Sequence, residues 1–82
     1  MRLLNYLNEK ADEPRYYAEV RVFEDGEDYI NVSTTGNTEQ EALKDAREWA
    51  KELGGKIKIV VFDTQHPQHG HWSIHVETKT YK

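Results

Sequence analysis

The chain has 82 residues, no cysteine and a formal net charge of −4. A chain of this length forms one domain with a small core, so we expect a single domain over residues 1–82. The absence of cysteine excludes a disulfide framework and thiolate chemistry. The longest apolar run, residues 59–62, is too short to cross a membrane, and the first residues lack the pattern of a secretory signal. We therefore expect a cytoplasmic protein with no membrane partner.

Acidic and basic residues are unevenly distributed along the chain. Residues 1–35 carry four Lys or Arg against eight Asp or Glu, residues 36–54 carry three against five, and residues 55–82 carry four against two. A nucleic-acid-binding surface needs a clustered positive field, so the acidic first half disfavours direct nucleic-acid binding. The same charge would steer the chain toward a basic partner, although a mild acidic balance also serves solubility alone.

The first predicted element, at residues 1–11, is either a helix or an extended arm. Apolar residues at positions 3, 4, 7 and 11 fit a short amphipathic helix, and the segment also fits an extended arm. A β-hairpin follows, with strands at residues 16–24 and 27–34 joined by Asp25-Gly26, a strong signal for a two-residue type I′ turn. Strict alternation would place Ile30 and Val32 on one face of the sheet and Tyr29, Asn31 and Ser33 on the other.

A helix is predicted over residues 38–53. Thr38 and Glu41 have the spacing of a capping box, in which a hydroxyl and a carboxylate each satisfy a free backbone amide. Gly54-Gly55 ends the helix, because the left-handed residue after a helix is usually glycine. One apolar stripe runs along the helix and consists of Ala42, Leu43, Ala46, Trp49, Ala50 and Leu53.

Two more strands are predicted, at residues 56–63 and 71–80, with a turn-rich stretch at residues 64–70 between them. The order β-β-α-β-β with a single apolar helix stripe predicts an α+β fold. We expect a two-layer sandwich in which an antiparallel sheet packs one face on the helix at residues 38–53. Trp49 and Trp72 should lie in the core or at its margin.

The sheet face away from the helix is expected to be the exposed one. It would display Tyr17, Arg21, Phe23, Tyr29, Phe62 and the histidines. In the last strand, alternation would place Trp72, Ile74 and Val76 on one side and His71, Ser73, His75 and Glu77 on the other.

All four histidines lie in residues 66–75, which raises the question of a metal site. His66, His69 and His71 could converge if the Pro/Gly-containing loop folds back. His71 and His75 are four residues apart on one strand, roughly 13 Å, which is too far for one ion. The spacing matches no zinc-ligand pattern, so we expect exposed polar histidines and no metal or other cofactor.

No catalytic arrangement is apparent in the sequence. The stretch His71-Trp72-Ser73 matches one half of a two-histidine phosphoesterase motif, but the second half is missing. The sequence contains neither a glycine-rich phosphate loop nor a nucleophile elbow. We therefore expect a non-enzymatic protein.

The exposed aromatic residues suggest a binding surface. Tyr17, Phe23 and Tyr29 would supply apolar anchors, and Glu24, Asp25, Glu27 and Asp28 would contact basic residues of a protein partner. The aromatic rings also fit a stacking platform for single-stranded nucleic acid, but such platforms are normally basic. Homodimerisation through this face or through an edge strand is the remaining alternative.

Two family resemblances accompany these patterns. The stretch G-N-T-E-Q-E-A-L-K-D-A-R-E-W-A at residues 36–50 resembles the helix of HicB-type antitoxins, which implies binding to a small basic toxin. The overall plan is similar to that of small phage-encoded anti-CRISPR proteins, with the first seven residues and residues 22–26 adding to the likeness. This second resemblance implies an inhibitor in the cytoplasm of a bacterial host that occludes a basic surface of a nucleoprotein defence complex.

Overall fold

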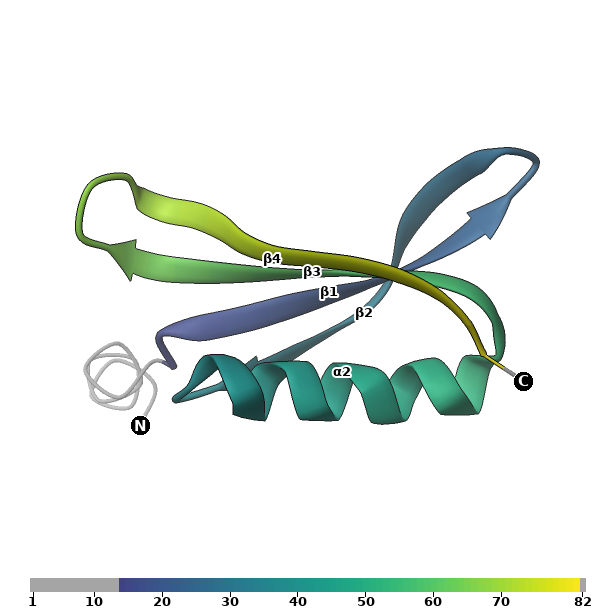
Figure 1. Ribbon diagram of the computed structural model, residues 1–82, viewed down its shortest axis with the longest axis horizontal. Helices are drawn as coiled ribbons and strands as arrows, with labels where there is room; N and C mark the ends of the chain where they lie inside the picture. The colour runs from purple at the N-terminus through teal and green to yellow at the C-terminus, as the bar shows by residue number, and fades with distance from the viewer. Residues whose placement is uncertain (1–13, 82) are drawn as a thin grey trace, which may run out of the picture.

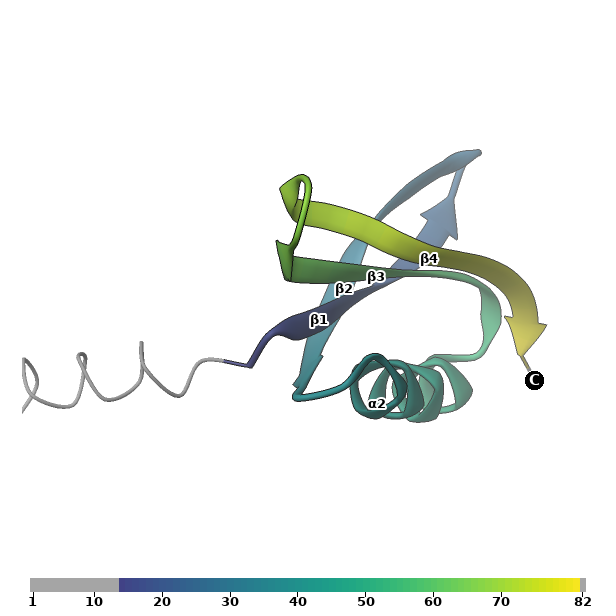
Figure 2. The same ribbon diagram turned by 60° about the vertical axis from the view of Figure 1, so that its left-hand side comes forward.

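The computed structural model describes residues 14–81, and the predicted β-β-α-β-β order is confirmed. The elements are β1 (Tyr16–Glu24), β2 (Glu27–Gly36), α2 (Glu39–Leu53), β3 (Gly55–His66) and β4 (Gly70–Tyr81). The strands form one antiparallel sheet in the order β2-β1-β3-β4, so β2 and β4 are its edges. Figures 1 and 2 show α2 as one layer against the sheet, and Figure 1 shows the two hairpin turns at opposite ends. The predicted helix or arm at residues 1–11 lies outside the described residues.

The ends of α2 are set by the residues that the sequence indicates. Thr38 adopts an extended backbone, and its hydroxyl accepts a hydrogen bond from the backbone N–H of Glu41 at 3.1 Å. The Glu41 carboxylate reaches one residue further back than in a standard capping box and accepts from the Asn37 N–H at 2.8 Å. At the other end, Gly54 has φ of 72°, and its N–H donates to the Ala50 carbonyl.

The helix packs on the sheet through alanine. Ala42, Ala46 and Ala50 are fully buried against the inner face, which we define as the face toward α2. The rest of the buried core comes from Ala18, Val20, Ile57, Ile59 and Val61. The expectation for the tryptophans is wrong, since Trp49 is 47% and Trp72 is 48% exposed. Alanine allows the helix to approach so closely that larger side chains of the stripe are pushed to its flanks.

Gly36 makes this close approach possible at the start of α2. A Cβ atom on Gly36 would lie 2.6 Å from both the Ala42 backbone nitrogen and the Glu41 Cβ. Nearby, the Thr34 hydroxyl donates to the Ala42 carbonyl at 2.8 Å and is buried. The end of β2 and the first turn of α2 are therefore in direct contact.

A bulge in the first hairpin overturns the predicted alternation in β2. Val20 pairs with Val32, but its neighbour Arg21 pairs with Ile30, so Asn31 is the extra residue. Residues paired across antiparallel strands share a face. Tyr29, opposite Val22, is consequently on the inner face, and Ile30 is on the outer face and 49% exposed. The prediction that Tyr29 shares a face with Tyr17 and Phe23 is wrong.

A second bulge, in β4, also overturns the predicted alternation of side chains. Val61 pairs with His75 and Phe62 pairs with Ser73, which leaves Ile74 as the extra residue. His75 and Glu77 therefore turn to the inner face, and Val76 turns to the outer face, where it is 54% exposed. The faces predicted for His75, Val76 and Glu77 are therefore wrong. The faces predicted for His71, Trp72 and Ser73 are confirmed. The strands also extend further than predicted, and the turn is confined to residues 67–69.

Candidate functional site

The acidic residues predicted to bind a partner gather at the first hairpin turn. Asp25 and Gly26 both have positive φ, 56° and 85°, as the predicted type I′ turn requires. Glu24 and Glu27 flank the turn and pair directly with each other. We call residues 24–27 the hairpin tip, and all four of them are exposed. Within residues 14–81 no ion pair involves Glu24, Asp25 or Glu27.

Tyr29 joins this cluster through its hydroxyl. The hydroxyl donates to the Glu24 carboxylate at 2.6 Å, which raises the pKa of Tyr29. Tyr29 is 46% exposed beside the hairpin tip and lies on the inner face, opposite Val22. One predicted anchor is therefore next to the predicted acids, although it points to the face opposite Tyr17 and Phe23.

Asp28 differs from the other three predicted acids because it is neutralised within the chain. It accepts a hydrogen bond from Arg21 at 2.7 Å, and the Lys58 ammonium lies 3.9 Å away. The Arg21 hydrogen bond lowers the pKa of Asp28. Arg21 also donates to Glu19 at 2.8 Å. Two positive and two negative charges on the outer face thus compensate one another, and of the four predicted acids Glu24, Asp25 and Glu27 are those without an ion pair in the described residues.

Tyr17 and Phe62 form an aromatic pair on the outer face. They are direct partners on the two central strands, and their rings stack with centroids 4.8 Å apart and planes inclined by 13°. The Tyr17 hydroxyl lies 2.6 Å from Nε2 of His71, whose ring meets Phe62 edge-on. The two rings thus cover one face of each other, which reduces the aromatic surface that could stack on nucleic-acid bases. Phe23 is similarly occupied by the Lys56 ammonium, 4.6 Å from its ring centroid.

The second hairpin turn brings two of the candidate metal ligands together but not the third. The His66 and His69 rings have centroids 5.1 Å apart, and His69 stacks on Trp72 at 3.9 Å. His71 lies on the outer face against Tyr17. In the part of the chain that the structure describes, no three His, Cys, Asp or Glu side chains are grouped as metal ligands would be.

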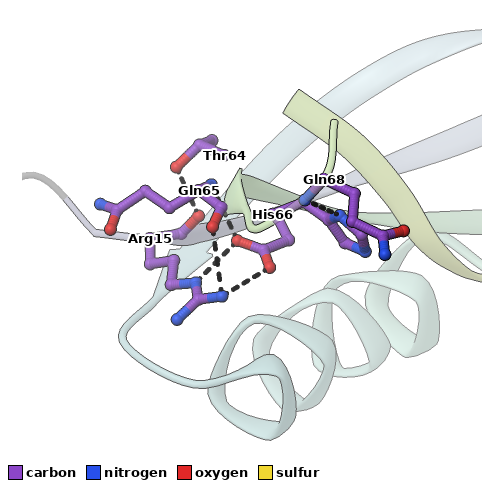
Figure 3. A network of polar contacts seen from close by, with 6 residues as sticks. Arg15, Thr64, Gln65, His66 and Gln68 are labelled. Carbon is purple, nitrogen blue, oxygen red and sulfur yellow. Dashed lines mark hydrogen bonds and ion pairs between the residues drawn. The ribbon is translucent and has the colours of Figure 1, made fainter. Parts of the chain in front are cut away.

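Arg15 and Asp63 form a polar network beside this turn that the sequence did not indicate (Figure 3). The guanidinium group donates two hydrogen bonds to the Asp63 carboxylate, at 2.8 and 2.9 Å, and Asp63 is 4% exposed. Asp63 also accepts from the Gln65 N–H, while Thr64 donates to the Arg15 carbonyl through its N–H and its hydroxyl. The Arg15 hydrogen bonds lower the pKa of Asp63. The network fixes the start of β1 to the end of β3.

Arg47 and Glu77 connect the helix to the edge strand β4. The guanidinium group donates to both carboxylate oxygens, at 2.9 and 2.7 Å, and His75 Nε2 lies 2.9 Å from Oε1. Hydrogen bonds from Arg47, and to a lesser degree from His75, lower the pKa of Glu77 to about 2. The bulge at Ile74 makes this contact possible, since it turns Glu77 toward α2.

Comparison with protein-family models, curated proteins and solved structures gives no match. Among residues 14–81 no helix is long and apolar enough to cross a membrane. Fold and site thus define a small α+β protein with an exposed acidic hairpin tip, and its function must be argued from that surface.

Proposed function

We propose that this chain is a non-enzymatic binding protein whose hairpin tip occupies a basic surface of a partner protein. This is the mode expected of a phage-encoded inhibitor that blocks a host defence complex. The observation that carries the proposal is the direct pairing of Glu24 with Glu27 around Asp25.

The paired negative charges of Glu24 and Glu27 oppose the stability of the first hairpin. Like charges directly opposite each other in an antiparallel sheet are destabilising. The type I′ turn does not require acids, since Asn-Gly suits it as well as Asp-Gly. Local features that oppose stability are typical of functional surfaces. We infer that the carboxylates are retained for a partner.

In mechanism, the uncompensated carboxylates would steer association with a positively charged patch. Lys and Arg side chains that hold nucleic-acid phosphates form such a patch. The half-exposed ring of Tyr29, held by its hydrogen bond to Glu24, would provide the desolvated contact beside the charges. Occupying the patch would exclude the nucleic acid.

The triple variant Glu24→Gln, Asp25→Asn, Glu27→Gln tests this proposal. Each change removes a charge and preserves shape, and Asn tolerates the left-handed backbone at position 25. We expect the variant to be more stable than the wild type in urea denaturation. We also expect it to associate at least tenfold more slowly with a basic partner captured from bacterial lysate, with a weaker salt dependence.

A control neutralises an acid that lies away from both the hairpin tip and the flanks of α2, with Glu39→Gln in the first turn of the helix. A second measurement uses bacterial strains that each carry one active CRISPR system, in which expression of the wild type should restore phage plaquing and the triple variant should not. Equal association rates for the wild type and the triple variant would assign no binding role to the hairpin tip. Restored plaquing by the triple variant would contradict the inhibitory mechanism.

A further inference from the structure

A groove runs between the end of β2 and one flank of α2. It has a volume of about 740 Å³ and is lined by Ser33, Thr34, Thr35, Asp45, Glu48, Trp49, Lys51 and Glu52. Trp49 lies here because the alanine contact displaces it from the core, and nearly half of its surface is exposed. We call this feature the β2–α2 groove.

Charge distinguishes the β2–α2 groove from the opposite flank of the helix. Three carboxylates line it, against the single ammonium of Lys51. The groove on the β4 side, of about 880 Å³, is lined instead by Lys44, Arg47, Lys51 and Lys79 with only Glu48 and Glu77. Since Arg47 neutralises Glu77, that side is basic. The β2–α2 groove therefore favours a cationic ligand.

The backbone beside the β2–α2 groove favours an extended ligand. Beyond the bulge, residues 32–36 of β2 pair without interruption with β1, from Val32↔Val20 to Gly36↔Tyr16. The side of this segment that faces β1 is therefore fully paired. In the described sheet β2 is an edge, and its other side has no paired strand. A free strand edge next to a pocket is the arrangement in which an added strand binds by main-chain hydrogen bonds.

We propose that the β2–α2 groove binds an extended, basic segment of a partner protein as an added strand along β2. A Lys or Arg side chain of this segment would lie on the Trp49 ring, and the carboxylates of Asp45, Glu48 and Glu52 would complete its charge neutralisation. This site is separate from the hairpin tip, so it extends the proposed function and can succeed or fail without it.

A synthetic basic peptide that can form a strand tests the site directly. The probe is the fluorescein-labelled peptide Lys-Thr-Val-Arg-Val-Thr-Lys, and binding to the full chain is followed by fluorescence anisotropy at low salt. We expect it to bind at least tenfold more tightly than Glu-Thr-Val-Glu-Val-Thr-Glu. Two N-methylated versions of the basic peptide, each blocking alternate amides, should differ, because only one set of amides can face β2. Equal binding by the unmodified peptide and both methylated versions would overturn strand addition.

Variants of the protein locate the site. Trp49→Ala should weaken binding of the basic peptide about tenfold. Trp72→Ala, which removes an equally exposed tryptophan at the far end of the sheet, is the matched control and should leave binding unchanged. The neutralised hairpin tip should also retain binding within threefold, which separates this site from the proposed function.

Two results would contradict the assignment. Amide chemical shifts that change along β4 rather than at residues 32–36 would place the peptide at the other edge. Sedimentation showing that the free protein self-associates, with Trp49→Ala restoring the monomer, would make a second copy of the chain the occupant. Shift changes confined to residues 32–36 and the Trp49 indole, in a monomeric protein, are the expected outcome.

Discussion

Replacing Glu77 with Gln should destabilise the protein at neutral pH and have little effect in acid. The carboxylate is held by Arg47 and His75, and its pKa falls from 4.5 to about 2. A difference of this size corresponds to about 3.4 kcal/mol, since each pKa unit represents about 1.36 kcal/mol. Arg47 is half exposed, so solvent screening reduces this value, and we expect a loss of about 1–2 kcal/mol.

The pH range of the effect follows from the direction of the shift. A carboxyl group whose pKa is lower in the folded chain contributes stability above its unfolded pKa. The contribution of Glu77 should therefore be complete above about pH 5, decline as the pH falls below 4.5, and be largely lost near pH 2. Over that range the unfolding free energies of the wild type and Glu77→Gln should converge.

Urea denaturation followed by circular dichroism at pH 7, 4 and 2.5 measures this convergence. Glu52→Gln, which neutralises an exposed acid on α2, is the control and should change stability by less than about 0.5 kcal/mol at every pH. Titration of the Glu77 carboxyl carbon by NMR gives the pKa directly. A carboxyl pKa near 4.5, or an equal cost of Glu77→Gln at pH 7 and 2.5, would refute the reasoning.

Four further outcomes are expected. Gly36→Ala should cost about 1–3 kcal/mol in urea denaturation, because its Cβ would overlap the first turn of α2. Trp49→Ala should cost about 2 kcal/mol or less, roughly half the usual loss for a buried tryptophan, since half of the side chain is exposed. Arg15→Ala should lower the urea midpoint more than Arg47→Ala does, because it leaves the Asp63 carboxylate buried and unpaired. Protein purified without a histidine tag should contain no stoichiometric zinc by elemental analysis, and one zinc per chain that is lost in His69→Ala would contradict this.

Features that depend on neighbouring residues could be predicted from the sequence. The type I′ turn at Asp25-Gly26 and the cap at Thr38 each follow from local backbone preferences, and both were confirmed. The order of elements follows in the same way, because two hairpins and one helix stripe leave a single face to bury.

Features that depend on pairing across strands could not be predicted from the sequence. Each bulge adds one residue that alternation does not reveal, and the faces of Tyr29 and Glu77 were consequently misassigned. The Arg15–Asp63 contact joins residues 48 positions apart, and no local pattern connects them. Trp49 was expected in the core or at its margin because it belongs to the apolar stripe, but the close approach of helix and sheet buries the alanines of that stripe instead.

The alanine-lined contact between helix and sheet has a consequence for the thermodynamics of unfolding. Among residues 14–81, four of the eight side chains in the buried core cluster are alanine, so unfolding of this part exposes little apolar surface for the number of residues involved. The heat-capacity change of unfolding scales with that surface. We expect it to fall below about 12 cal/mol/K per residue, with a correspondingly small denaturant m-value. The curve of unfolding free energy against temperature should therefore be flat, so that neither moderate warming nor cooling changes the folded fraction sharply.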